Sequence, residues 1–201
     1  DLGKFFVTWQ DGKGQTAIFD KAKAEALAEK AVRLVFSDLL TAYHCPDDTR
    51  ARAHMHAASN LAGFAFDYTS LGINHGIAHA IGGVFHIPHG RCNAVLLPHV
   101  IAYNAKNSQF AFDRYTALSR MLELGAASEY QTLKNFCNAI HALMLKMNMP
   151  TTLRDCGVSE SEFRQHLPSI IENALADRCT ATNPVEMSAD GVREILTRAF
   201  G

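Results

Sequence analysis

The chemistry that this sequence could perform is concentrated in one stretch rich in histidine. Residues 74–104 hold half of the ten histidines, namely His75, His79, His86, His89 and His99. His75 and His79 are four residues apart, so on a helix they lie on one face. His75 and His89 are fourteen residues apart, which on one straight helix means about 21 Å of rise. Because zinc and iron bind imidazole nitrogen at about 2 Å, these two can share a metal only if the chain bends back between them.

The residues between the two histidines permit such a bend. The Gly-Gly pair at 82–83 can end or loosen a helix, and Pro88 biases Ile87 away from helical geometry. His89 would then stand at the start of a new helix, with Gly90 leaving room for the backbone. The spacing alone leaves two interpretations open, which are a metal site and a set of packed or surface histidines.

Helices must position these histidines. From 21 to about 43, apolar residues recur at helical spacing after Asp20, which is of the type that caps helix N-termini. Cap and breaker residues predict the other helices: about 48–66, 70 through the histidines at 75 and 79, 88–104, Ser108 or Asp113 to about 124, 129–147, 159–177 and 189–200. Strand signals are nearly absent beyond residue 19. The sequence therefore predicts an all-α fold, a helical bundle of about eight helices.

The first nineteen residues differ from the rest. Residues 5–9 are strand-like in composition and 11–14 form a turn signal, which is typical of a hairpin or of the truncated start of a longer structure. We therefore divide the chain into an N-terminal segment, 1–19, and a helical metal-binding domain, 20–201.

Composition excludes several classes of function. The chain of 201 residues has a formal net charge of −1 and no basic tract, so neither nucleic acid nor an anionic membrane is expected as a partner. No apolar run is long enough to cross a bilayer. The five cysteines contain no CxxC pair, which argues against a disulfide scaffold and a thiolate zinc site. Scattered thiols favour a reducing, cytoplasmic location.

The histidine stretch and its surroundings closely resemble the signature of the iron-activated (group III) alcohol dehydrogenases. The similarity extends over nearly everything from residue 20 onward, and its clearest motifs are 57–66 (AASNLAGFAF), 72–83 (GINHGIAHAIGG), 87–90 (IPHG), 93–100 (NAVLLPHV) and 177–184 (DRCTATNP). This resemblance implies the C-terminal helical domain of such an enzyme, with a dehydroquinate synthase-like fold.

The resemblance also implies a divalent metal, Fe²⁺ or alternatively Zn²⁺, with His75 and His89 as two of its four protein ligands. The other two in the family are an Asp and a His four residues apart. No Asp here has a His four positions later, and the chain begins at Asp1 without Met, as an excised fragment would. We therefore expect half a site, which binds metal more weakly because fewer fixed ligands offset the lost hydration.

Three further residues gain candidate roles from the resemblance. His79 corresponds to a histidine beside the metal and the nicotinamide, which makes it a catalytic proton relay or a substrate-orienting group. The alternative is a histidine that contacts a metal ligand without binding the metal, or one that is buried and hydrogen-bonded. Phe66 corresponds to an aromatic residue near the nicotinamide, with plain core packing as the alternative. Cys179 lies in the segment that borders the active site, with an inert buried thiol as the alternative.

The implied reaction is the reversible oxidation of a small alcohol to an aldehyde or ketone by NAD or NADP. The family's N-terminal nucleotide-binding domain would be the partner, since this chain has no GxGxxG turn. The fragment alone should be inactive, and we expect a homo-oligomer. The family also occurs in metabolic microcompartments. Two alternatives remain: a non-catalytic helical metal-binding or assembly module, and a helical metallohydrolase, which the absence of any His-Asp pair disfavours.

Overall fold

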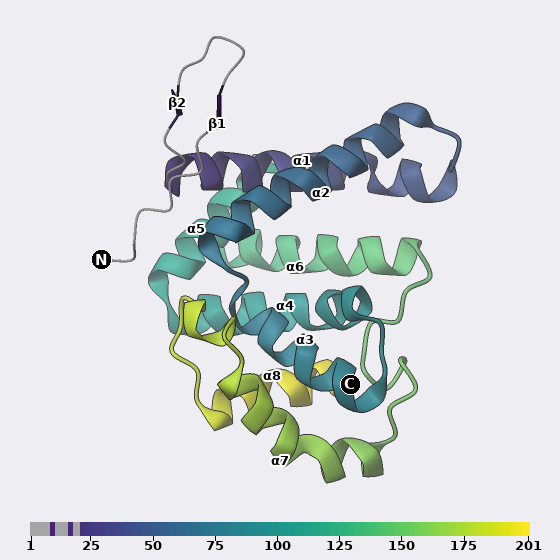
Figure 1. Ribbon diagram of the computed structural model, residues 1–201, viewed down its shortest axis with the longest axis vertical. Helices are drawn as coiled ribbons and strands as arrows, with labels where there is room; N and C mark the ends of the chain where they lie inside the picture. The colour runs from purple at the N-terminus through teal and green to yellow at the C-terminus, as the bar shows by residue number, and fades with distance from the viewer. Residues whose placement is uncertain (1–8, 11–15, 18–20) are drawn as a thin grey trace. The chain divides into compact units, whose positions relative to one another are not determined.

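The computed structural model describes residues 9–10, 16–17 and 21–201 (Figure 1). Within these ranges the fold is all-α with eight α-helices, which confirms the predicted class. Two short strands, β1 (Trp9–Gln10) and β2 (Thr16–Ala17), pair antiparallel with Trp9 opposite Ala17. The strand-like residues 5–8, the turn signal at 11–14 and the N-cap predicted at Asp20 lie outside the described residues. None of the helices within those ranges combines the length and apolar character that a bilayer crossing demands.

The chain divides into two compact units, one up to Ser70 and one from Leu71 to Gly201. In the first unit, α1 (Lys21–His44) and α2 (Thr49–Thr69) pack along one another. Asp48 caps α2 by accepting a hydrogen bond from the Ala51 N–H at 2.8 Å. That the residues from 20 to 201 form one domain stays a prediction.

Small buried residues recur every seven positions where α1 meets α2. A spacing of seven keeps side chains on one helical face, and small side chains let two helices approach closely. The buried residues of this pattern are Ala24 and Ala31 on α1, and Ala51, Ala58 and Ala65 on α2. Asp38 occupies the next position of the series on α1 and is only 4% exposed.

Partners from both helices surround the Asp38 carboxylate. Ser37 donates its hydroxyl to Asp38 Oδ2. Nδ1 of His54 on α2 lies 2.8 Å from the same oxygen, and Arg50 Nη1 lies 3.2 Å from Oδ1. His54 therefore helps to join α2 to α1.

The second unit contains the other helices, and α3 and α4 lie among them (Figure 1). Their bounds are α3 (Gly72–Phe85), α4 (His89–Asn107), α5 (Gln109–Met121), α6 (Glu129–Lys146), α7 (Glu160–Ala176), the 3₁₀ turn η1 (Thr180–Thr182) and α8 (Ala189–Phe200). The stripe Ile73, Ile77 and Ile81 on α3 is fully buried, and this helix packs against α4 and α7. A buried helix of this kind holds its side chains in fixed directions.

Serine caps begin four of these helices, each close to the start that the sequence predicted. Ser108 rather than Asp113 opens α5, while Ser128 and Ser188 cap α6 and α8. Ser159 begins α7 in a capping box, in which the backbone N–H of Ser159 donates to Glu162 Oε2 at 3.1 Å. Each cap satisfies N–H groups that the helix leaves without partners.

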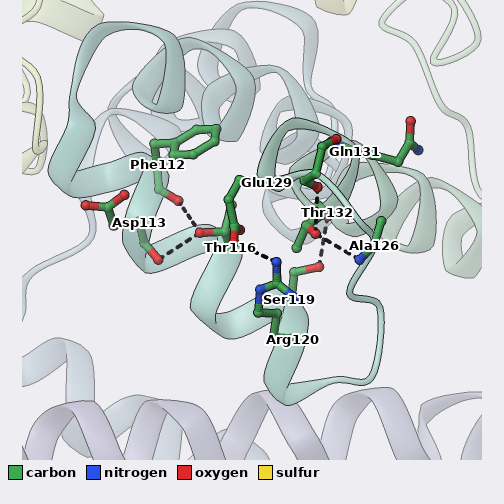
Figure 2. Close-up of polar contacts among 10 residues, drawn as sticks. Phe112, Asp113, Thr116, Ser119, Arg120, Ala126, Glu129, Gln131 and Thr132 are labelled. Carbon is green, nitrogen blue, oxygen red and sulfur yellow. Dashed lines mark hydrogen bonds and ion pairs between the residues drawn. The ribbon is translucent and has the colours of Figure 1, made fainter.

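Polar contacts join α5 to α6, as Figure 2 shows. Ser119 donates its hydroxyl to the carbonyl of Thr132 at 2.9 Å, and Thr132 Oγ1 accepts the N–H of Ala126 at 2.9 Å. Ser119 and Thr132 are both completely buried. Arg120 and Glu129 form an ion pair between the same helices at 2.6 Å. These bonds fix the short loop, and both helices pack against α4.

Candidate metal centre

The chain turns between α3 and α4, as the predicted shared site requires, but not at the glycines. Helix α3 continues through Gly82 and Gly83 to Phe85, and its C-cap residue His86 has a left-handed φ of 54°. The His86 N–H donates to the carbonyl of Gly82 at 3.0 Å. Pro88 has extended backbone and precedes His89, the first residue of α4. The prediction for Pro88 is confirmed, whereas His86 does what was predicted for the glycines, because a left-handed residue satisfies the carbonyls at a helix end.

This turn brings three histidines together. The ring centroid of His75 lies 5.1 Å from that of His89 and 5.9 Å from that of His79, and the centroids of His79 and His89 are 5.1 Å apart. Each ring offers a nitrogen within 4.8 Å of those of the other two. Nitrogens that share one ion lie about 3.3 Å apart for tetrahedral coordination at about 2.0 Å. Small side-chain movements would therefore make His75 and His89 ligands, which stays a prediction.

His75 has the environment of a ligand. Its Nδ1 is buried and has no hydrogen-bond partner among the described residues. A buried polar atom without a partner costs free energy, and a bound cation would remove that cost. Burial, and after it the neighbouring His89 and His79, lower the pKa of His75. A lower pKa favours the neutral ring that metals bind.

Two asparagines orient His89. Asn93, one turn further along α4, donates its Nδ2 to His89 Nε2 at 3.0 Å. Asn74 on α3 donates to Asn93 Oδ1 at 2.7 Å. These contacts fix the direction of the ring. Because Asn93 donates to Nε2, an ion would bind His89 at Nδ1, with the ring proton moved to Nε2 and the Asn93 amide turned to accept it. The sequence gave no role to Asn74 or Asn93, although Asn93 follows His89 by four residues, a spacing that predicts contact on a helix.

His79 forms a hydrogen bond with a carboxylate that lies 98 residues later in the chain. Its Nδ1 lies 2.8 Å from Asp177 Oδ2, and Asp177 Oδ1 accepts the N–H of Cys179 at 2.8 Å. Burial alone would raise the pKa of Asp177, but hydrogen bonds from His79 and Cys179 outweigh it and lower this pKa. Asp177 is therefore an anion at neutral pH. The sequence motif 177–184 contained it, yet the role of Asp177 was missed.

Close packing holds the segment of Asp177 against α3. A Cβ added at Gly76 would lie 2.2 Å from Thr180 Oγ1, so only glycine fits there. Thr182 and Asn183 accept hydrogen bonds from the N–H groups of Gly72 and Ile73, at 3.3 and 3.4 Å. These bonds satisfy donors at the start of α3, whose N-cap residue supplies no side-chain bond.

The other predicted site residues lie in different surroundings. Phe66 is on α2 in the first unit and is 45% exposed, so it is not packed in a core. It borders a hollow of about 480 Å³ on that helix, lined by His56, Ser59, Asn60, Gly63, Phe64, Phe66 and Asp67. Cys179 is partly buried at the start of η1. Contact of Phe66, His79 or Cys179 with a cofactor stays a prediction.

Comparison with known sequences identifies the family that this chain resembles. Residues 18–200 match the profile described as Fe-containing alcohol dehydrogenase family, C-terminal. The chain is 37% identical to an NADPH-dependent butanol dehydrogenase of Clostridium saccharobutylicum, over 86% of this chain and 43% of the relative. It is 38% identical to the 1-propanol dehydrogenase PduQ of Salmonella typhimurium, over 86% of this chain and 47% of the relative. The chain thus spans less than half the length of these relatives.

Solved structures agree with the sequence comparisons. A 1,3-propanediol oxidoreductase superimposes with a TM-score of 0.80 at 32% identity, covering 88% of this chain and 45% of that one. An iron-containing alcohol dehydrogenase from Thermococcus thioreducens gives 0.78 at 30% identity, covering 88% and 44%.

Proposed function

The chain belongs to the Fe-containing alcohol dehydrogenase family, and from this premise we propose that it forms the metal-holding part of an NAD(P)-linked enzyme. That enzyme would interconvert a small alcohol and its aldehyde or ketone by hydride transfer. The observation that carries the proposal is the meeting of His75 and His89 at the turn between α3 and α4, with the buried Nδ1 of His75 lacking a partner.

His75 and His89 would hold a divalent ion, with Fe²⁺ preferred and Zn²⁺ as the alternative. When bound, such an ion supplies Lewis-acid chemistry that lowers the pKa of an alcohol hydroxyl. The chain's own contribution is orientation: Asn93 and Asn74 fix the ring of His89, and burial keeps His75 neutral.

His79 is the proposed proton relay. Asp177 is ionised and can only accept a hydrogen bond, so His79 Nδ1 carries a proton and Nε2 is left to accept one. Asp177 would also stabilise the imidazolium that forms when His79 takes a proton. The side chain of His79 is 45% exposed, so its ring can exchange this proton with water.

The remaining parts of the proposal concern the cofactor, the nucleotide-binding domain and the assembly of the enzyme. Phe66, His79 and Cys179 would border the nicotinamide, whose NAD or NADP carrier would be bound mainly by an N-terminal nucleotide-binding domain. The greater length of the relatives supports such a domain. We further propose a homo-oligomer in the cytoplasm or in a metabolic microcompartment. The 201 residues alone should then show no alcohol oxidation.

Metal content tests the proposal. The purified chain is expected to bind Fe²⁺, and His75→Ala and His89→Ala should each abolish Fe²⁺ binding. His141→Ala is the matched control, because His141 is an exposed histidine on α6 outside the candidate metal groups. Equal metal content in all three variants would contradict the proposed site. Alcohol-dependent reduction of NAD⁺ by the 201 residues would contradict the predicted inactivity.

The alternative is a non-catalytic metal-binding or assembly module with the same fold. This alternative is motivated by the candidate metal groups, which among the described residues include no Asp and His four positions apart. Joining the chain to the N-terminal half of a relative discriminates: metal binding without turnover would support the module, and turnover would support the enzyme.

A further inference from the structure

We propose that His79, Asp177 and Cys179 form a second cation site for a soft divalent ion such as Zn²⁺ or Cd²⁺, beside the histidine cluster of His75, His79 and His89. The two sites share His79. One ligand atom from each of the three residues lies within 4.8 Å of the other two. No sequence motif indicated this site, because its residues are spread over about half of the chain.

Three separate segments supply the ligands of the second cation site. His79 is on α3, Asp177 is the residue that ends α7, and Cys179 precedes η1. Asp177 already touches both others, with Oδ2 lying 2.8 Å from His79 Nδ1 and Oδ1 lying 2.8 Å from the Cys179 N–H. The packing of Thr180 against Gly76 holds this loop in place. The ligands are therefore positioned before an ion binds.

The donor set selects the class of ion. Thiolate, imidazole and carboxylate are the three ligand types that zinc takes in proteins. Calcium and magnesium prefer oxygen ligands and would gain little from Cys179 and His79. A single thiolate suffices in such a mixed set, so the absence of a CxxC pair does not argue against it. Three protein ligands leave the fourth position to water, as in open zinc sites.

Binding of a divalent ion releases one proton. Binding removes the proton of the Cys179 thiol, which leaves to solvent while a sulfur–metal bond forms. The proton on His79 Nδ1 moves to Nε2, so the ring changes tautomer and stays neutral. The hydrogen bond between His79 and Asp177 is replaced by two bonds to the ion. Thiolate and carboxylate together neutralise its double charge.

Occupancy of the second cation site has a functional consequence. If His79 is the proton relay, then an ion on its ring prevents it from exchanging protons with the histidine cluster. Excess soft metal would then inhibit an assembled enzyme. This consequence rests on the proposed function, whereas binding of the ion does not.

Cadmium is the probe, because a cadmium–thiolate bond absorbs in the ultraviolet and bonds to nitrogen or oxygen do not. Titration of the 201-residue chain with Cd²⁺ should give one saturable charge-transfer band. Cys179→Ser should abolish this band, and Asp177→Asn should weaken binding at least about tenfold. The double variant His75→Ala/His89→Ala should keep the band, although it disables the histidine cluster.

The controls separate the possible outcomes. Cys45→Ser removes an exposed thiol elsewhere and should leave the band unchanged. A band that survives Cys179→Ser, no band at all, or a band lost in the double histidine variant would each overturn the second cation site. The last two do not affect the test of the proposed function, which measures Fe²⁺ rather than Cd²⁺. Alkylation of unmodified protein gives a check that requires no variant: Cd²⁺ should slow the labelling of Cys179, and an unchanged rate would also overturn the site.

Discussion

Gly76 is the residue that decides whether the loop of Asp177 can reach α3. In Gly76→Ala the new Cβ would overlap Thr180 Oγ1, which already donates to the carbonyl of Ala174 at 2.5 Å. Since overpacking costs about 1–3 kcal/mol, we expect a loss of that order in the free energy of unfolding, measured by urea denaturation. The loop should also move away from His79, which would weaken its bond to Asp177.

Gly83 provides the matched control on the same helix. A Cβ there meets nothing within 4 Å, so Gly83→Ala should stabilise the protein by up to about 1 kcal/mol through helix propensity alone. Equal effects of the two substitutions would show that Gly76 is not selected by its contact with Thr180.

Asn93 is predicted to act on metal affinity through His89. Its Nδ2 donates both to His89 Nε2 at 3.0 Å and to the carbonyl of His89 at 3.1 Å. Asn93→Ala frees the ring, so we expect metal affinity to fall by about 10- to 100-fold, measured by competition with a chelating dye. Asn107→Ala removes a similar amide at the end of α4, bonded to Tyr103, and should leave affinity unchanged. A loss shared by both variants would point to a general effect on α4.

At the scale of elements, the buried Asp38 makes the pairing of α1 and α2 depend on pH. Hydrogen bonds from Ser37 and then from His54 lower the pKa of Asp38 below its ordinary 3.8. The unfolded chain therefore binds this proton more readily than the folded chain. The contribution of Asp38 is complete above pH 3.8 and is lost as the pH falls through the lower folded value.

Asp38→Asn should remove that part of the acid dependence. We expect the variant to be less stable near neutral pH, and the difference from the unmodified protein to shrink as the pH falls below 3.8. Urea unfolding between pH 7 and pH 3 measures this difference in the free energy of unfolding. Asp47→Asn, in the exposed loop after α1, is the control. A constant difference across this range would exclude an ionised Asp38 as the cause.

Most of the elements followed from local signals, and much of the site did not. Helical periodicity and serine caps predicted the helices within a few residues, because caps and apolar stripes act over one or two turns. Pro88 predicted the start of α4 for the same reason. The end of α3 was misassigned, since Gly82 and Gly83 remain helical and His86 adopts the left-handed conformation. A left-handed histidine has no local signature that distinguishes it from its neighbours.

At the scale of the whole molecule, the missed contacts are those that cross the chain. Asp177 reaches His79 across 98 residues, and Asn183 reaches Ile73 across 110. Periodicity carries no information on such pairs, and the resemblance in 177–184 marked the segment without assigning a partner. By contrast, the approach of His89 to His75 requires only one turn between neighbouring helices. The residues at that turn permitted a shared site without deciding it, and the family resemblance implied the pairing.

All residues of both candidate metal sites lie in the unit from Leu71 to Gly201, which contains the fully buried Ile73, Ile77 and Ile81. A polypeptide of residues 71–201 should therefore fold and keep the metal affinity of the longer chain within about threefold, since a factor of three is less than 1 kcal/mol. Circular dichroism and the chelator competition measure the two properties. The complementary polypeptide, residues 1–70, should bind no ion. If 71–201 folds but loses its affinity, the geometry of the histidine cluster depends on the first unit. If it fails to fold, the two units are not independent, and the metal site is a property of the whole chain.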